Sequence, residues 1–179
     1  MHRVDTTVLD QSGMSYDAIQ SLKGLDVSDA EVAEMVKAKQ EGFSDATCVE
    51  FLKIARQRQQ PLDFVDAAAG MRQVGMSEPD VLELARLNEL GLDAGELQAT
   101  RLAGLPDGVI LAIARKHAAG QPVLSGVSLA EMMNTGMSRQ TLAELVRRGV
   151  PDSQAKTIIA MKRHRISDAE ILRHYPSGT

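Results

Sequence analysis

The sequence predicts an all-α protein made of about eleven short helices, tightly connected to one another. A three-part pattern recurs along it: a glycine, one apolar residue and a helix-capping residue. Glycine takes the left-handed conformation that ends one helix, and the capping residue accepts hydrogen bonds from the free N–H groups of the next. The pattern occurs at Gly42-Phe43-Ser44, Gly75-Met76-Ser77, Gly91-Leu92-Asp93, Gly126-Val127-Ser128 and Gly136-Met137-Ser138, and with an inserted proline at Gly104-Leu105-Pro106-Asp107 and Gly149-Val150-Pro151-Asp152.

Two further observations support this fold class. A Ser or Asp is followed three residues later by an acidic residue in several places, which is the spacing of a capping box. These pairs are Ser28/Glu31, Ser77/Asp80, Asp93/Glu96, Ser128/Glu131 and Ser167/Glu170. Runs of alternating apolar and polar residues rich in β-branched side chains, which are typical of strands, are absent from the sequence.

Each predicted helix begins or ends at one of these signals. In chain order, Gly24 ends helix 15–23, Ser28 caps 29–40, Ser44 caps 45–58, Pro61 precedes 63–73, Ser77 caps 78–89, Asp93 caps 94–102, Asp107 begins 107–118, Ser128 caps 129–134, Ser138 caps 139–147, Asp152 begins 152–163 and Ser167 caps 168–174. Apolar residues at three- and four-residue spacing give these helices a buried face. Examples are Val32, Met35 and Val36; Val81, Leu82, Ala85 and Leu87; and Ala155, Ile158 and Ile159.

Short helices must bury their apolar faces on each other, and two arrangements achieve this: an orthogonal bundle or an irregular stack of helical hairpins. Uneven spacing of the punctuating glycines disfavours a perfect solenoid. We expect a mobile N-terminal tail over 1–13 and a single all-α domain over 14–179. An echo about sixty residues apart indicates a degenerate duplication, about 42–103 and 104–174, or independent reuse of the same caps.

Charge is distributed unevenly along the chain, whose formal net charge is −4. Residues 136–179 hold eight basic and four acidic residues, which leaves the acidic excess in the rest. Two interpretations fit: basic residues in last helical turns stabilise the helix dipole, or they form an anion-binding or nucleic-acid-binding surface. The candidate residues for such a surface are Arg147, Arg148, Lys156, Lys162 and Arg163.

The segment around Gly149 resembles the second half of a helix-hairpin-helix, a family that binds the DNA backbone without sequence specificity. Gly149, Val150, Ala155 and Ile158 match the family pattern, but Pro151 replaces its second glycine. The resemblance implies that hairpin N–H groups hold a phosphate. Proline has no N–H group, so this departure removes part of that chemistry.

Enzyme signatures are missing from the sequence: it has no nucleotide-binding glycine loop, no zinc-protease motif and no nucleophile elbow. The four histidines lack metal-ligand spacing, and the single cysteine, Cys48, lies on an apolar helix face, which predicts a buried structural thiol. We therefore expect no catalytic residue, no cofactor and no metal. The longest apolar run, 109–114, is too short to cross a membrane, so we expect no membrane insertion. A single cysteine cannot form an intrachain disulfide, which fits a reducing compartment, and we therefore expect a cytoplasmic protein.

These observations favour a non-catalytic helical module that binds another protein or itself, because stacked helices present extended grooves. The alternative is weak, sequence-independent nucleic-acid binding through the basic C-terminal third. An enzyme remains a further alternative, and it requires a deep pocket that holds at least two titratable groups with shifted pKa values.

Overall fold

The computed structural model describes residues 7–91 and 94–177, which form twelve α-helices, one short 3-10 helix and no strand. This confirms the predicted all-α class. The elements are α1 Thr7–Gln11, α2 Tyr16–Lys23, α3 Asp29–Gln40, α4 Asp45–Gln57, α5 Val65–Gln73, α6 Glu78–Arg86, α7 Ala94–Leu102, α8 Asp107–Ala118, α9 Gly126–Asn134, α10 Arg139–Arg147, η1 Asp152–Gln154, α11 Ala155–Arg163 and α12 Asp168–His174. Within the described ranges, none of the helices is long and apolar enough to cross a membrane.

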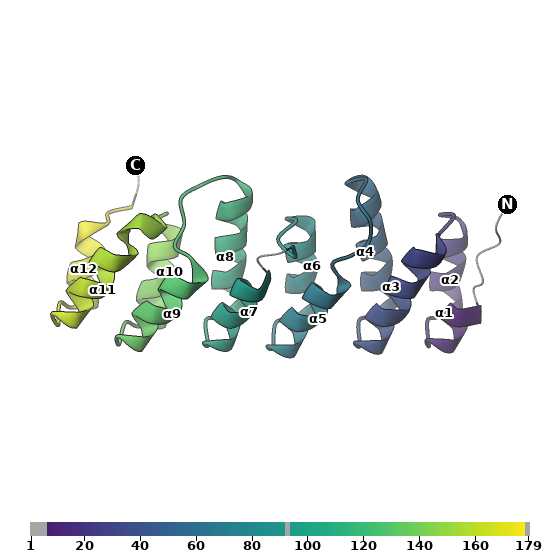
Figure 1. Ribbon diagram of the computed structural model, residues 1–179, viewed down its shortest axis with the longest axis horizontal. Coiled ribbons are helices and arrows are strands. Elements are labelled where there is room, and N and C mark those ends of the chain that lie inside the picture. The colour runs from purple at the N-terminus through teal and green to yellow at the C-terminus, as the bar shows by residue number, and fades with distance from the viewer. Residues whose placement is uncertain (1–6, 92–93, 178–179) are drawn as a thin grey trace.

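Consecutive helices pair into antiparallel hairpins that lie side by side in a row from the N- to the C-terminal end (Figure 1). Odd-numbered helices pack on odd-numbered neighbours and even-numbered helices on even-numbered ones, so the molecule has two layers. The hairpin stack is therefore the arrangement observed, not the orthogonal bundle. Contacts run between neighbouring hairpins, so each hairpin is covered by the one before and the one after.

The turn inside each hairpin has the same local structure, and equivalent turn residues are 29 to 33 residues apart. The first five turns use a glycine at positive φ, and the sixth uses Arg165 at φ 62°. The next residue is apolar and points into the core, as Phe43 (1% exposed) and Leu105 (0% exposed) illustrate. This spacing is difficult to recognise in the sequence because glycines with other roles lie between the turn glycines.

Two of those other positions, Gly126 and Gly91, differ from the sequence expectation. Gly126 does not end a helix; it is the first residue of α9, and Ser125 caps that helix by accepting a hydrogen bond from the Ser128 N–H. The helix predicted at 129–134 thus starts three residues earlier. Asn88, at φ 61°, takes the left-handed position expected for Gly91. The predicted cap Asp93 lies outside the described residues.

The N-terminal segment also differs from expectation. Residues 7–11, placed in a mobile tail, form helix α1, and its Leu9 is 1% exposed. This helix packs on α3, which explains why its single buried leucine is enough to hold it. In the rest of the predicted tail, Ser12 and Gly13 form the turn that follows α1, and residues 1–6 lie outside the described residues.

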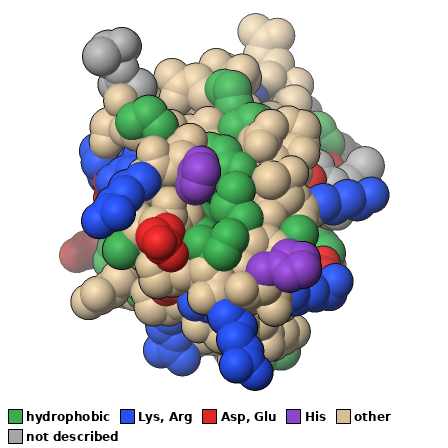
Figure 2. Space-filling view, turned by 90° about the vertical axis from the view of Figure 1, so that its left-hand side faces the viewer, with side chains coloured by type: hydrophobic (Ala, Val, Ile, Leu, Met, Phe, Trp, Pro, Cys, Tyr) green, Lys and Arg blue, Asp and Glu red, His purple; other side chains and the backbone are tan. Residues whose placement is uncertain are grey.

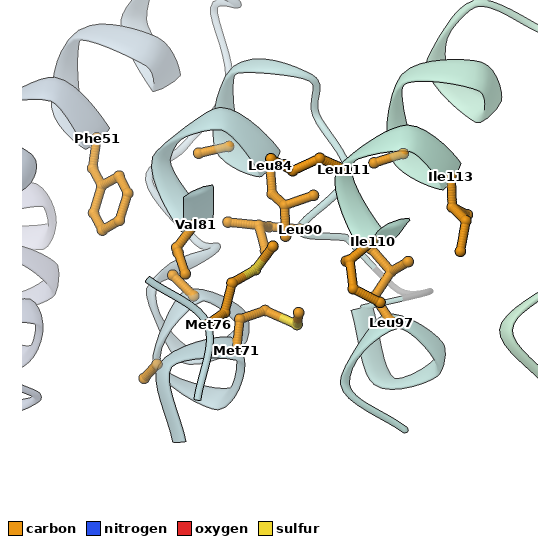
Figure 3. Packing of buried hydrophobic residues seen from close by; sticks show 14 of the residues in the cluster. Phe51, Met71, Met76, Val81, Leu84, Leu90, Leu97, Ile110, Leu111 and Ile113 are labelled. Atoms are coloured by element: carbon orange, nitrogen blue, oxygen red, sulfur yellow. The ribbon is translucent and has the colours of Figure 1, made fainter. Parts of the chain in front are cut away.

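The core is continuous along the row and consists mainly of aliphatic side chains and methionine (Figure 3). In Figure 3, Met71 and Met76 lie between the layers of the third hairpin, and Ile110 and Leu97 lie in the fourth. In each even-numbered helix from α2 to α10, the residue seven positions after the N-cap is apolar and buried. These residues are Leu22, Phe51, Leu84, Ile113 and Leu145. In the last hairpin this position is the exposed His174, because no further hairpin of the structure covers it.

Two glycines let the odd-numbered helices approach closely, but their surroundings differ. A Cβ at Gly126 would collide with Thr100 Oγ1 and would lie 3.1 Å from Thr100 Cβ and 3.2 Å from Glu96 Cγ. A Cβ at Gly70 would meet only the end of the flexible Gln98 side chain. Neither glycine has a positive φ, so contact decides the outcome at both positions.

We therefore expect opposite effects from the same substitution. Gly126→Ala should lower the free energy of unfolding by about 1–3 kcal/mol because α7 and α9 must separate. Gly70→Ala should leave it unchanged or raise it by up to about 1 kcal/mol, because alanine favours the helix and Gln98 can move. Urea unfolding followed by far-UV circular dichroism measures both. If Thr100→Ala does not reduce the cost of Gly126→Ala, the proposed collision is wrong.

Candidate functional site

Carboxylates link neighbouring hairpins in a regular series. The first residue of an even-numbered helix accepts a hydrogen bond from the backbone N–H of the cap serine in the preceding hairpin. The pairs are Ser15 N–H to Asp45 (2.9 Å), Ser44 N–H to Glu78 (2.8 Å), Ser77 N–H to Asp107 (3.0 Å) and Ser138 N–H to Asp168 (2.9 Å). We call these carboxylates the acid ladder. Each one satisfies a backbone donor that the serine's own helix leaves free.

A basic residue six positions earlier reinforces three of these carboxylates. Lys39 lies 2.8 Å from Asp45, Arg101 lies 2.7 Å from Asp107, and Lys162 lies 2.6 Å from Asp168. Together with the hydrogen bonds, these cations explain why the pKa values of the carboxyl groups are lowered.

The pKa values of the acid ladder are all lowered. The hydrogen bond from Lys39 is the largest influence on the pKa of Asp45. For the other three, burial is the largest influence and opposes the shift, but hydrogen bonds outweigh it. At Asp168, donors from Lys162, Ser138 and Thr141 bring the pKa down to about 2.

The series is interrupted between the fourth and fifth hairpins, and three residues change together there. Pro106 occupies the cap position and has no N–H to donate. The residue that would accept is Arg139, and the residue six positions before it is Met133. The Arg139 side chain lies against the turn instead, where a Cβ on Gly104 would be 2.7 Å from its Nη2. The carboxylate is absent where its donor is absent, which indicates that these acids connect neighbouring hairpins.

The five basic residues predicted to bind an anion are divided by the structure. Arg147 and Arg148 end α10 and Lys156 begins α11, whereas Lys162 and Arg163 lie at the other end of α11. Nine helical residues separate these ends by about 13 Å.

Carboxylates already engage four of these five side chains. Arg147 and Arg148 share Glu144 (2.6 and 2.7 Å), Lys162 pairs with Asp168, and Arg163 lies 3.4 Å from Glu131. Arg148 also donates to the carbonyl oxygens of Leu172 (2.7 Å) and Tyr175 (2.9 Å). Lys156 alone has no hydrogen-bond or ion-pair partner within the described residues. This pairing supports the helix-terminus interpretation of the basic C-terminal third.

The segment that resembles a helix-hairpin-helix has a different use here. Pro151 caps the short helix η1, and Asp152 occupies the start of that helix. Asp152 Oδ1 accepts hydrogen bonds from the Ser125 N–H (2.9 Å) and the Ser128 hydroxyl (2.7 Å). The place where the family would bind phosphate thus holds a carboxylate that caps α9.

The single cysteine is buried as predicted. Cys48 is 0% exposed in α4, and burial raises the pKa of its thiol to about 11. A thiol with such a pKa remains protonated near neutral pH and is a poor nucleophile. Among the described residues, no group of three or more His, Cys, Asp or Glu side chains could hold a metal ion.

The outer surface of the even-numbered helices is charged. Its basic residues occupy the same position in successive hairpins: Lys53, Arg86, Arg115 and Arg147. They pair with glutamates, within a helix at Lys53–Glu50 (3.3 Å) and between hairpins at Arg115–Glu83 (3.2 Å). Positive and negative charges therefore alternate along this layer and largely cancel.

The outer surface of the odd-numbered helices is different. Of the four large hydrophobic side chains exposed within the described residues, three lie on it: Val8 (43%), Leu102 (74%) and Val127 (67%). Most of their neighbours on this surface are uncharged, although the exposed Glu131 lies one turn after Val127 on the same face of α9, and we call the uncharged set the uncharged strip. It consists of Gly70, Gln73, Gly95, Ala99, Leu102, Val127 and Asn134. In α7, three of these residues recur at four- and three-residue spacing, on the face opposite the buried Leu97 and Thr100.

Ion pairs border the uncharged strip on both sides. Lys37 of α3 lies 3.3 Å from Asp66 of α5, and Arg163 of α11 lies 3.4 Å from Glu131 of α9. The outer faces of α5 and α9 therefore each carry one acidic side chain beside the strip residues, whereas the strip residues of α7 have no charged residue among them.

The C-terminal end of the row shows a second gathering of apolar side chains (Figure 2). In that view an apolar stripe crosses the end, with histidine side chains beside it and Lys or Arg side chains around it. The apolar side chains of α11, α12 and their flanking residues that border the core, Met161, Ile166, Leu172 and Tyr175, are only partly exposed and pack against it. The most exposed apolar side chains of α7 and α9 are on the uncharged strip instead.

Comparison with known proteins gives no relative: no protein-family model matches the chain, and no curated protein matches its sequence.

Proposed function

We propose that this chain is a non-catalytic scaffold of repeated helical hairpins whose odd-numbered helices bind another protein. One observation carries the proposal: the outward face of α7 and the start of α9 carry exposed apolar side chains, and the outward residues of α7 are uncharged. Leu102 and Val127 stand out from a background of Gly95 and Ala99. Exposed apolar surface with a polar border is typical of protein-binding sites.

The chemistry of the uncharged strip favours an amphipathic helix of the partner. Small residues at Gly95 and Ala99 let a second helix lie close to the surface of α7, whereas the Gln98 side chain lies against Gly70. Leu102 and Val127 sit near opposite ends of their helices, so a partner helix that contacts both must present apolar residues that are more than one turn apart. The strip carries no charge, and charged side chains on the partner would therefore lie outside the contact.

The roles of the titratable groups support a non-catalytic function. The acid ladder and Asp152 have lowered pKa values because donors of the preceding hairpin bond to them and because, at Asp45, Asp107 and Asp168, a basic residue of the same hairpin does so too. Shifted pKa values at an active site would serve the reaction, whereas here each one has a partner in the fold.

Site-specific photocrosslinking tests the proposal. A benzophenone amino acid at position 102 or 127 should crosslink the same partner in an extract of the source cells. The same probe at Lys53 or Arg86, on the charged even-helix surface, is the matched control and should give no such product. Leu102→Glu should abolish crosslinking from position 127 without changing the circular dichroism spectrum.

The site of the crosslink in the partner identifies the binding mode. We expect it within an amphipathic helical segment. Adducts in an extended segment would show that the partner binds as an extended peptide and not as a helix. Equal crosslinking from positions 53 and 86 would overturn the assignment of the surface.

A further inference from the structure

A pocket of about 250 Å³ lies where the connections between hairpins meet the starts of α7 and α9. Four apolar side chains form its wall: Leu97, Ile113, Val123 and Leu124. Its volume is below the range typical of drug-sized ligands and suits a group of side-chain size.

The polar residues of the pocket are not equivalent. Glu96 Oε1 accepts a hydrogen bond from the Gly126 N–H (2.5 Å), and Ser125 caps α9, so both serve the fold. Glu89 is different: its carboxylate is 13% exposed and contacts the Nδ1 of His117 at 3.0 and 3.1 Å. Within the described residues this imidazole is its only side-chain partner.

This arrangement leaves room for a second donor at the Glu89 carboxylate. Both carboxylate oxygens contact one imidazole nitrogen, a carboxylate can accept several hydrogen bonds, and no Lys or Arg is among the described residues that line the pocket. A largely buried carboxylate is stabilised by a cation that can approach it. An aliphatic chain can pack against the apolar wall beside the carboxylate, whereas water or an inorganic cation gains nothing from that wall.

We propose that this pocket binds an aliphatic ammonium group, with Glu89 as its anionic partner and the wall of Leu97, Ile113 and Leu124 around the alkyl chain. Two sources have this chemistry: a small free alkylamine and the side chain of a lysine in a partner protein. The pocket opens beside the starts of α7 and α9, which also carry part of the uncharged strip, but the proposal does not depend on that strip.

Nuclear magnetic resonance of protein labelled at Ile, Leu and Val methyl groups tests the proposal. Titration with n-pentylammonium should shift the methyl signals of Leu97, Ile113 and Leu124. The uncharged isostere n-pentanol should bind about tenfold more weakly or worse, because it lacks the charge that Glu89 attracts. If the wild-type protein binds n-pentanol as strongly as n-pentylammonium, the proposal is wrong. This comparison requires no variant.

Two variants make the test specific. Glu89→Gln should weaken n-pentylammonium binding about tenfold or more, while Glu83→Gln, which alters a surface glutamate paired with Arg115, should leave it unchanged. Methyl signals far from the pocket report whether each variant is folded. Unchanged binding by Glu89→Gln would contradict the proposed role.

The source of the ammonium group is decided by a second ligand. N-acetyl-lysine methylamide should bind at least as well as n-pentylammonium if the pocket receives a lysine side chain. Binding of n-pentylammonium alone would identify a free amine as the ligand. Failure of both ligands would overturn the pocket assignment and would leave the photocrosslinking test of the uncharged strip unaffected.

Discussion

Phe51→Ala should lower the free energy of unfolding by about 3–5 kcal/mol, the largest effect we expect from any single substitution here. Phe51 is 0% exposed in α4. Its ring meets Phe43 edge-on at 5.2 Å and Phe64 at 5.3 Å between ring centroids. The substitution therefore removes two aromatic contacts and leaves a cavity between the second and third hairpins.

Two matched substitutions separate cavity formation from general damage. Phe51→Leu keeps most of the volume and should cost less than about 1.5 kcal/mol. Phe64→Ala removes a ring that is only partly buried, so its cost should fall well below that of Phe51→Ala. Urea unfolding monitored by far-UV circular dichroism gives all three values. Equal costs for Phe51→Ala and Phe64→Ala would show that the aromatic cluster is not centred on Phe51.

Acidification should destabilise the fold through the acid ladder, and this is the second large effect. The folded-state pKa values of Asp45, Glu78, Asp107 and Asp168 lie below their ordinary values. Groups of this kind contribute stability that is complete above their unfolded-state pKa and is lost as the pH falls through the folded-state pKa. Stability should therefore fall from about pH 5 towards pH 2, where Asp168 titrates.

Asp168→Asn isolates one member of the ladder. It removes the ion pair with Lys162 and weakens the bonds from Ser138 and Thr141, so it should cost about 1–2 kcal/mol near neutral pH. The difference from wild type should shrink as the pH approaches 2. Asp66→Asn, at an exposed carboxylate paired with Lys37, is the control and should change stability by less than about 0.5 kcal/mol.

Unfolding at several pH values, followed by circular dichroism, measures this linkage. A constant difference between wild type and Asp168→Asn from pH 7 to pH 2 would contradict it.

Because contacts run mainly between neighbouring hairpins, we expect the last hairpin to open before the others. Faster exchange of amide hydrogens in α11 and α12 than in the other helices would show this.

Much of the local structure could be predicted from the sequence. Ser28 and Ser167 form reciprocal capping boxes with Glu31 and Glu170, as their spacing predicts. Local signals of this kind depend on residues three or four apart. Prediction was wrong at Gly126, where the glycine is needed for the approach of α7 and not for a turn. No local signal distinguishes these two roles.

The candidate sites were less predictable. The sequence drew attention to the basic residues from Arg147 to Arg163, yet the structure pairs four of the five with carboxylates. The regular spacing of the hairpin turns was a usable signal for the acid ladder, since Asp45, Glu78, Asp107 and Asp168 each follow a turn by the same number of residues. No sequence signal pointed to Glu89, because only its place in a pocket distinguishes it, and residues distant in sequence build that pocket.

The sequence by itself determined that the chain is all-α, where most helices begin and end, and that Cys48 and the apolar stripes are buried. These properties follow from local backbone preferences and from the periodicity of apolar residues. Only the tertiary structure decided that the hairpins stack in a row, that carboxylates cap the neighbouring hairpin, and that Leu102 and Val127 share one outer face. Those features depend on which surfaces meet across about thirty residues of chain, and packing between helices selects among arrangements that local signals leave equal.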